Sequence, residues 1–323
     1  MLSVLILVLC LFVALILSAC RGDSGEGGIS GTGGSPNIHV NGAAEKGPFL
    51  KRSEVTYRYI NAQGETISDD VSTETTDNMG SFTLVLRNEG LISIRVEGYH
   101  YNELNNQISD GPLVLKAIFE ANQEESQHAY VNIMTHLISD RVLELNHNNQ
   151  ISTNLAISQA EQELLSELDD TIPQIGINDF SQLSIYNSNS SSNQGNAYLL
   201  LLSAALYQHA LNNTAVGSSQ SGQLTSFLNA LADDFVDGDL EASSDILDGL
   251  VLAIQQLDPQ GVITNLENRS NDVLGEKLEV ADFTDFIGQF IITNPAAESK
   301  LSEVTTIRTE VPRGLKNVTM DFM

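Results

Sequence analysis

Residues 75–86 read TTDNMGSFTLVL, and this stretch decides the first half of the fold. Asp77 and Asn78 belong to the residue types that turn the chain, and Gly80 adopts backbone conformations that other residues resist. Phe82 follows directly, at a position where its ring can enter a core. We therefore predict a hairpin turn at residues 77–80 that leads into a strand over residues 81–86.

On both sides of this stretch lie other short runs rich in β-branched and aromatic residues. They are residues 54–60 (EVTYRYI), 91–96 (LISIRV) and 112–119 (PLVLKAIF). Turn-forming Asn, Asp and Gly residues separate the runs at intervals. Several short strands at such spacing indicate a β-sandwich.

Beyond residue 120 the apolar residues recur with the period of a helix. Residues 130–145 place Ile133, Leu137, Ile138 and Val142 on one face, and residues 152–168 repeat the pattern with Leu155, Ala160, Leu164 and Leu168. Residues 197–211 (AYLLLLSAALYQHAL) are apolar nearly all round, as in a central buried helix, and are too few to span a bilayer. Further helical segments are expected over residues 223–235, 240–257 and 259–267, with a short turn at 282–290. The predicted fold class is multidomain, an all-β sandwich of transthyretin or immunoglobulin type followed by an all-α helical bundle.

Four motifs carry a resemblance to a known family. They occur in the order 42–49 (GAAEKGPF), 55–57 (VTY), 76–82 (TDNMGSF) and 97–99 (EGY). This order resembles the carboxypeptidase regulatory-like, or transthyretin-like, β-sandwich, and the resemblance implies an accessory domain without a catalytic centre. Residues 132–137 (NIMTHL), 196–204 (NAYLLLLSA) and 233–235 (DDF) resemble the helical half of an uncharacterised group of bacterial envelope lipoproteins that carry such a sandwich. That group has no assigned activity.

The N-terminus predicts the cellular compartment. Residues 1–19 carry no charge and are almost wholly apolar, and residues 17–20 (LSAC) resemble the lipobox of bacterial lipoproteins. The resemblance implies that a lipoprotein signal peptide is removed, that Cys10 leaves with it, and that Cys20 is acylated, with palmitate among the chains. Several acyl chains together anchor a protein stably. An uncleaved N-terminal anchor is the alternative, because an apolar run of this length could also form a spanning helix. Residues 1–3 depart from the signal-peptide pattern, since they lack the usual Lys or Arg.

The chain therefore divides into five predicted parts. They are a signal peptide (1–19), a Gly/Ser-rich tether (20–36), a carboxypeptidase regulatory-like β-sandwich (37–120), an acidic helical domain (121–290) and a C-terminal tail (291–323). Arg21 stands where Asp commonly signals inner-membrane retention, so we expect the outer membrane, on its periplasmic face or at the cell surface.

The charge is strongly negative and unevenly distributed. The formal net charge is -27, of which residues 121–290 carry -21 and residues 37–120 only -5. Such a balance repels phosphates and excludes nucleic acid as a partner. The expected contacts are a membrane, through the lipid anchor, and a protein or surface-polymer partner. With two cysteines in all, neither a disulfide scaffold nor a cysteine-rich metal site is expected.

No assembled set of catalytic, cofactor-binding or metal-ligating residues is visible. The six histidines are scattered without the helical HExxH pairing: His39, His100, His128, His136, His147 and His209. We interpret His136 as a packed or capping side chain and His209 as one that favours the dipole at a helix end. No nucleophile elbow, dinucleotide-binding glycine motif or phosphate-binding loop occurs.

The acidic residues leave two questions open. In residues 233–241 (DDFVDGDLE), Phe235 breaks the calcium-loop pattern, so the segment is either an irregular calcium site or a helix end, a Gly turn and an acidic cap. The adjacent acids Asp169-Asp170 and Asp233-Asp234 are the only support for a carboxylate-based hydrolase or glycan-processing enzyme. Adjacent helical residues point about 100° apart, which is poor geometry for an acid–base couple. We therefore predict a non-catalytic envelope protein that uses no cofactor, with the enzyme as the alternative.

Overall fold

The computed structural model describes residues 37–123, 127–149, 151–169, 171–172, 177–186 and 193–287. The predicted signal peptide, the tether with Cys20 and the C-terminal tail lie outside these residues. The described residues all belong to the compact unit that begins at Asn37. Among them, no helix is both long and apolar enough to cross a lipid bilayer.

The first sheet is mixed and is built around β1 (Ile38–Glu45). Strand β1 pairs antiparallel with β4 (Ser81–Leu86) and parallel with the short strands β9 (Gln127–His128) and β10 (Val131–Asn132). Because β9 and β10 follow residue 120, part of the predicted helical domain completes a sheet of the predicted sandwich.

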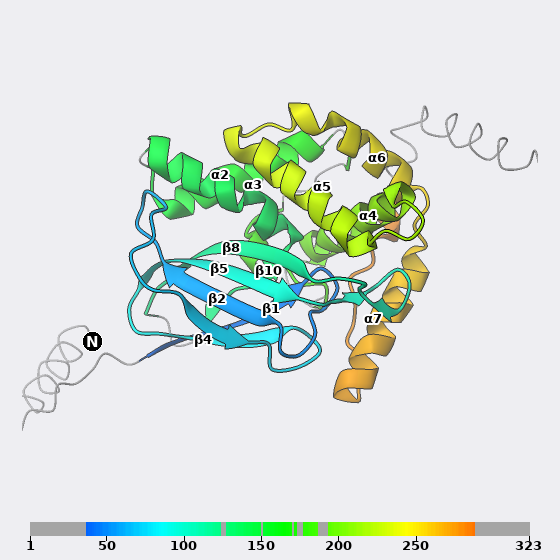
Figure 1. The fold of residues 1–323 in the computed structure, drawn as a ribbon, viewed down its shortest axis with the longest axis horizontal. Coiled ribbons are helices and arrows are strands. Elements are labelled where there is room, and N and C mark those ends of the chain that lie inside the picture. The colour runs from blue at the N-terminus through cyan, green and yellow to red at the C-terminus, as the bar shows by residue number, and fades with distance from the viewer. Residues whose placement is uncertain are drawn as a thin grey trace, which may run out of the picture. The chain divides into compact units, whose positions relative to one another are not determined.

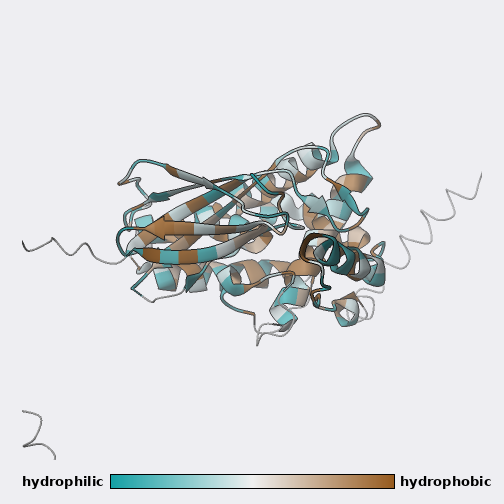
Figure 2. Cartoon of the chain, turned by 90° about the horizontal axis from the view of Figure 1, so that it is seen from below, coloured by the Kyte–Doolittle hydropathy of each residue, from teal (hydrophilic) through white to brown (hydrophobic). Residues whose placement is uncertain are grey.

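The second sheet is antiparallel, and its strand order is β3-β2-β5-β8. Its strands are β2 (Glu54–Tyr59), β3 (Val71–Glu74), β5 (Gly90–Gly98) and β8 (Leu113–Ala121). A small hairpin of β6 (Tyr101–Asn102) and β7 (Gln107–Ile108) follows β5. The strands over 54–60, 81–86, 91–96 and 112–119 are thereby confirmed to within two residues at each end. Figure 1 shows β2, β5 and β8 lying over β1 and β4, and the strands in Figure 2 carry hydrophobic and hydrophilic residues in turn.

The turn at residues 77–80 forms, but it is not a hairpin. The Asp77 carboxylate accepts the backbone N–H groups of Met79 and Ser81 at 2.9 and 3.1 Å, Gly80 has φ +79°, and Phe82 is buried. However, β3 pairs with β2 whereas β4 pairs with β1, so the turn is a corner between the two sheets. The hairpin prediction was wrong because turn chemistry fixes a reversal of the chain and not the strand that each arm pairs with.

Helices make up most of the described residues after residue 132. They are α2 (Ile133–Asn149), α3 (Thr153–Leu168), α4 (Asn193–Asn213), α5 (Gln220–Asp234), α6 (Ser244–Ile254) and α7 (Pro259–Leu274), with short 3-10 helices η1 (Phe180–Gln182), η2 (Phe235–Asp237) and η3 (Glu241–Ser243). The predicted apolar face of α2 is confirmed, since all four of its residues are buried. In α3 the prediction fails at Leu155, whose exposed fraction is 62%, because the buried face of that helix runs through Ala156, Ala160 and Leu164 and Leu155 lies beside it.

The hydrophobic core is continuous from the strands into the helices. One cluster of buried side chains includes Val40 of β1, Leu115 of β8, Leu137 of α2 and Leu201 of α4. Helix α2 packs directly on β8, and Figure 1 shows α2 and α3 running along that edge of the sheet. The described residues thus form a mixed α and β structure in which the strands come first and the helices share their core.

Candidate functional site

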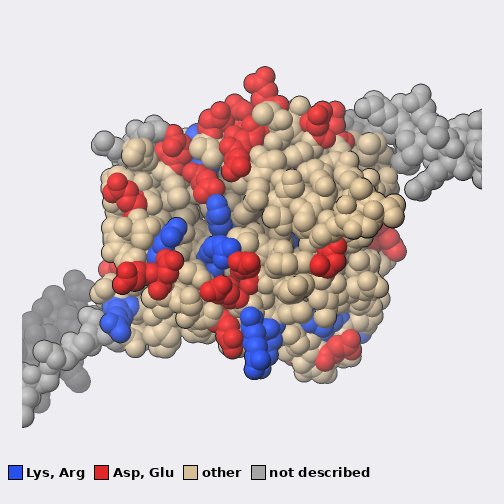
Figure 3. Space-filling model, viewed as in Figure 1, with Lys and Arg blue, Asp and Glu red and all other residues tan. Residues whose placement is uncertain are grey.

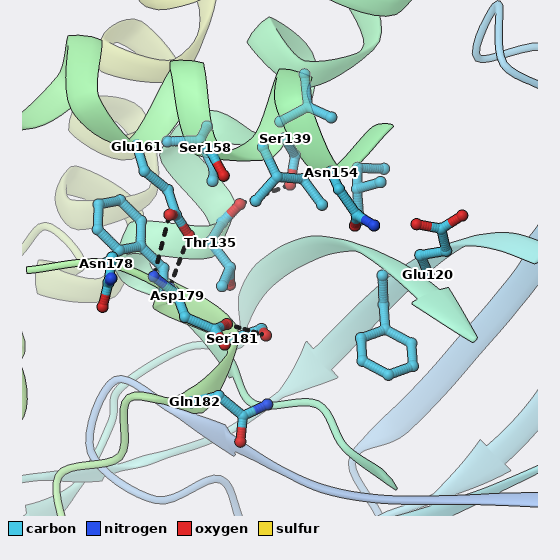
Figure 4. A pocket seen from close by; sticks show the side chains of 16 residues that line it. Glu120, Thr135, Ser139, Asn154, Ser158, Glu161, Asn178, Asp179, Ser181 and Gln182 are labelled. Carbon is cyan, nitrogen blue, oxygen red and sulfur yellow. Dashed lines mark hydrogen bonds between the residues drawn. The ribbon is translucent and has the colours of Figure 1, made fainter. Parts of the chain in front are cut away.

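The candidate site is a cavity of about 370 Å³ where strand β8 meets the helices (Figure 4). Three elements and one connecting segment contribute to it: β8, α2, α3 and residues 178–182. The sixteen lining residues are Ile118, Phe119, Glu120, Thr135, Ile138, Ser139, Val142, Asn154, Ile157, Ser158, Glu161, Asn178, Asp179, Phe180, Ser181 and Gln182. A cavity of this size with an apolar floor and polar groups around it is typical of small-molecule sites.

Glu161 is a polar group of the cavity whose position is fixed by two hydrogen bonds. It lies on the buried face of α3 with an exposed fraction of 4%, and its two oxygens accept the backbone N–H groups of Asp179 (3.0 Å) and Phe180 (2.7 Å). Burial raises the pKa of Glu161, and the two N–H groups oppose that rise. The carboxylate therefore holds the connecting segment against α3 and has little freedom to act as a catalyst.

Asp179 has an unusual backbone conformation at the mouth of the cavity. Its φ of +56° lies in the left-handed region, which Asp tolerates better than most residues other than Gly. Its carboxylate accepts the Ser181 hydroxyl at 2.8 Å as η1 begins. Strained residues of this kind cluster at ligand-binding sites, which makes the segment around Asp179 a second mark of the site.

The mouth of the cavity also carries uncharged polar side chains. Asn154, Ser158 and Asn178 are exposed and make no side-chain hydrogen bond to any described residue. Gln182 is engaged, because its amide donates to the His128 carbonyl at 3.0 Å. The free amides and hydroxyl are available to a ligand at the rim, while the floor is apolar.

A second polar cluster is buried inside the fold and includes Glu45 and Lys46 of the GAAEKGPF motif. Glu45 at the end of β1 accepts the Ser184 hydroxyl and the Ile185 N–H, both at 2.9 Å. Burial raises the pKa of Glu45 to about 7, although these two hydrogen bonds lower it. Glu45 thus joins the first sheet to the segment that precedes α4.

Lys46, the residue after Glu45, belongs to the same buried cluster. Its ammonium lies 2.5 Å from a Glu103 oxygen, and both side chains are completely buried. The Ser203 hydroxyl of α4 donates to the Lys46 carbonyl and lies 3.2 Å from the same Glu103 oxygen. Burial lowers the pKa of Lys46, and the charge of Glu103 opposes this. These buried groups connect the sheets to α4.

Two of the histidines singled out in the sequence, His136 and His209, are packed inside the fold. His136 is 1% exposed, and burial lowers its pKa to about 4, as the prediction of a packed side chain requires. His209 stacks on the ring of Phe227 with the centroids 4.4 Å apart, and burial lowers its pKa. Burial thus opposes the positive charge that the dipole near the end of α4 would favour, and the structural role of His209 rests on its packing against Phe227.

The acidic segment 233–241 forms a helix end. Helix α5 ends at Asp234, Gly238 has φ +101°, and the carboxylates of Asp237 and Asp239 accept nearby backbone N–H groups at 3.3 and 3.1 Å. Among the described residues, no three acidic, His or Cys side chains converge as metal ligands. Neither Asp169 nor the pair Asp233-Asp234 lines the cavity, and Asp170 lies outside the described residues.

Sequence reasoning missed Glu161 and Asp179. One signal was present, because Glu161 lies one residue after Ala160 on the apolar side of its helix. A carboxylate on a buried face needs a partner, and here the partner is a backbone segment about eighteen residues away. Nothing in the sequence identifies that segment or the conformation of Asp179.

Neither a family model, nor a curated protein, nor a solved structure matches this chain. The functional assignment therefore depends on the site and on the sequence motifs.

Proposed function

We propose that this chain is a lipid-anchored protein of the bacterial outer membrane with a non-catalytic binding role. Cys20 is its acylated N-terminus, residues 20–36 are its tether, and the cavity beside Glu161 is its ligand site. The observation that supports the lipid anchor is the LSAC motif at residues 17–20. The hydrogen bonds of Glu161 support a binding role over a catalytic one, because both of its oxygens accept backbone N–H groups.

We also propose that the strand-rich part is a sandwich of the carboxypeptidase regulatory-like, transthyretin-like kind, followed by a helical bundle. Two observations support this proposal. The two sheets lie one over the other, with the Tyr57 hydroxyl donating to the Val85 carbonyl at 3.0 Å between them. The TDNMGSF motif also forms a tight corner with Phe82 in the core. The partner is a small ligand, a protein or a surface polymer, and not a nucleic acid.

Cell fractionation of wild type and Cys20→Ala tests the anchor. We expect the wild type to sediment with the outer membrane and to be released only by detergent. The Cys20→Ala chain should keep residues 1–19, migrate as a longer polypeptide and collect in the inner membrane, because its processing site is lost.

The matched control is Cys10→Ala, which changes the other cysteine. Since Cys10 lies in the segment that is removed, this variant should behave as the wild type does. If Cys20→Ala had the same length and distribution as the wild type, the segment 1–19 would be an uncleaved anchor and the lipoprotein proposal would fail.

A further inference from the structure

The charges around the cavity are of one sign. Its lining includes the carboxylates of Glu120, Glu161 and Asp179, and none of the sixteen lining residues is a lysine, arginine or histidine. The three acids come from different elements, namely β8, α3 and the segment before η1. An anionic ligand would meet repulsion here without a compensating partner.

The acids lie at two ends of the cavity. Figure 4 shows Glu120 at one end, and Glu161 with Asp179 at the other. The floor is supplied by apolar side chains that include Ile138 and Val142 of α2 and Ile118 of β8, all of them buried. The site therefore offers negative charge, then an apolar stretch, then negative charge again.

A positive ligand would offset the repulsion between the Glu161 and Asp179 carboxylates. After burial, the charge of Asp179 is a further cause that raises the pKa of Glu161. An ammonium group between these two carboxylates would replace repulsion with two charge-assisted hydrogen bonds. The Glu161 oxygens keep lone pairs for this purpose, since a carboxylate accepts about four hydrogen bonds and the backbone of the connecting segment donates two.

The electrostatic field of the surrounding acidic residues also favours positively charged ligands. The net charge of residues 121–290 is -21, and Figure 3 shows acidic side chains gathered over the helices while acids and bases mix over the strands. Such a surface raises the local concentration of cations and speeds their association.

We propose that the cavity binds an organic dication with an apolar middle, such as an aliphatic diamine. One ammonium group lies between Glu161 and Asp179, the alkyl chain covers the apolar floor, and the second ammonium group faces Glu120. This inference rests on the proposed binding role of the cavity and names its ligand class.

Calorimetric titration of the full mature chain in non-ionic detergent tests the inference, with 1,5-diaminopentane as the probe. We expect saturable binding that weakens as salt is added, because the contacts are charged. The neutral 1-pentanol and the anionic pentanoate should bind at least about tenfold more weakly, since each lacks the charge-assisted contacts.

Two substitutions locate the site. Asp179→Asn keeps the size of the side chain and its tolerance of a left-handed backbone, and Glu120→Gln changes an exposed strand residue. Each should weaken diamine binding about three- to tenfold, and the double variant more than either. The matched control is Asp233→Asn, which removes an exposed acid on α5 that does not line the cavity, and it should bind within about twofold of the wild type.

The inference is overturned if the diamine gives no heat at millimolar concentration, or if Asp179→Asn and Asp233→Asn weaken diamine binding equally. It is also overturned if a neutral sugar such as N-acetylglucosamine binds more tightly than the diamine. The last result would leave the binding role intact and change only the ligand class. Failure of the Cys20→Ala experiment would remove the anchor without affecting the titration, so the two failures are distinguishable.

Discussion

Lys46→Met is expected to lower the free energy of unfolding by about 3–5 kcal/mol, a large share of the about 5–15 kcal/mol that stabilises a typical domain. Lys46 and Glu103 are both fully buried, with the ammonium 2.5 Å from the carboxylate. Removing the lysine leaves a buried carboxylate without its counter-charge. The ammonium also lies 4.7 Å from the centre of the Tyr207 ring, a contact that methionine replaces only in part. Urea denaturation followed by circular dichroism measures the loss.

The matched control is Lys116→Met, which removes the lysine of a half-exposed pair with Asp140 at 3.0 Å. Because solvent screens that pair, we expect a loss within about 1 kcal/mol. The double variant Lys46→Met with Glu103→Met should recover most of the stability, since replacing a buried pair by apolar residues is often neutral. Equal losses in Lys46→Met and Lys116→Met would contradict the structural role of the buried pair.

The second large effect is a dependence of stability on pH that originates at Glu45. Burial raises the pKa of this carboxyl from its ordinary value of 4.5 to about 7. The folded state therefore holds the proton more tightly than the unfolded state does. The stability from this group is fully present below about pH 4.5 and is lost as the pH rises through 7. By the linkage relation, the loss is roughly 2–4 kcal/mol.

The comparison with Glu45→Gln isolates this contribution from that of other titrating groups. Glutamine is neutral at every pH, so the variant should become more stable relative to the wild type as the pH rises from 5 to 8. The control Glu54→Gln removes an exposed glutamate from β2, a strand of the other sheet, and its difference from the wild type should stay constant over this range. A constant difference for Glu45→Gln as well would mean that Glu45 is not buried beside Ser184 and Ile185.

Periodicity and turn chemistry depend on residues that are close in sequence, so the features of the fold that they determine could be predicted. Helix α7 is an example, because Asp258 caps it and Pro259 occupies its first position, as the proline in the sequence indicates. No local pattern predicts strand β1, since residues 38–45 (IHVNGAAE) mix polar and small residues. Its identity comes from pairing with β4, β9 and β10, which are distant in sequence.

The features that escaped prediction share one physical cause. Glu45, Lys46 and Glu161 are charged residues that most sequences place on the surface, and here all three are buried by partners far along the chain. The sequence suggested a boundary at residue 120, yet Glu45 and Lys46 bond across it to Ser184 and Ser203. Partners at such a distance are set by tertiary packing, and no local pattern encodes them.

The central claim is that the mature protein begins at Cys20 and is held in the membrane by acyl chains on that residue. Intact-mass spectrometry of the chain extracted from membranes measures this directly. The account predicts a polypeptide of residues 20–323 whose mass exceeds that of the bare sequence by a diacylglycerol and an amide-linked acyl chain. A chain that starts at Met1 and carries no added mass would contradict it.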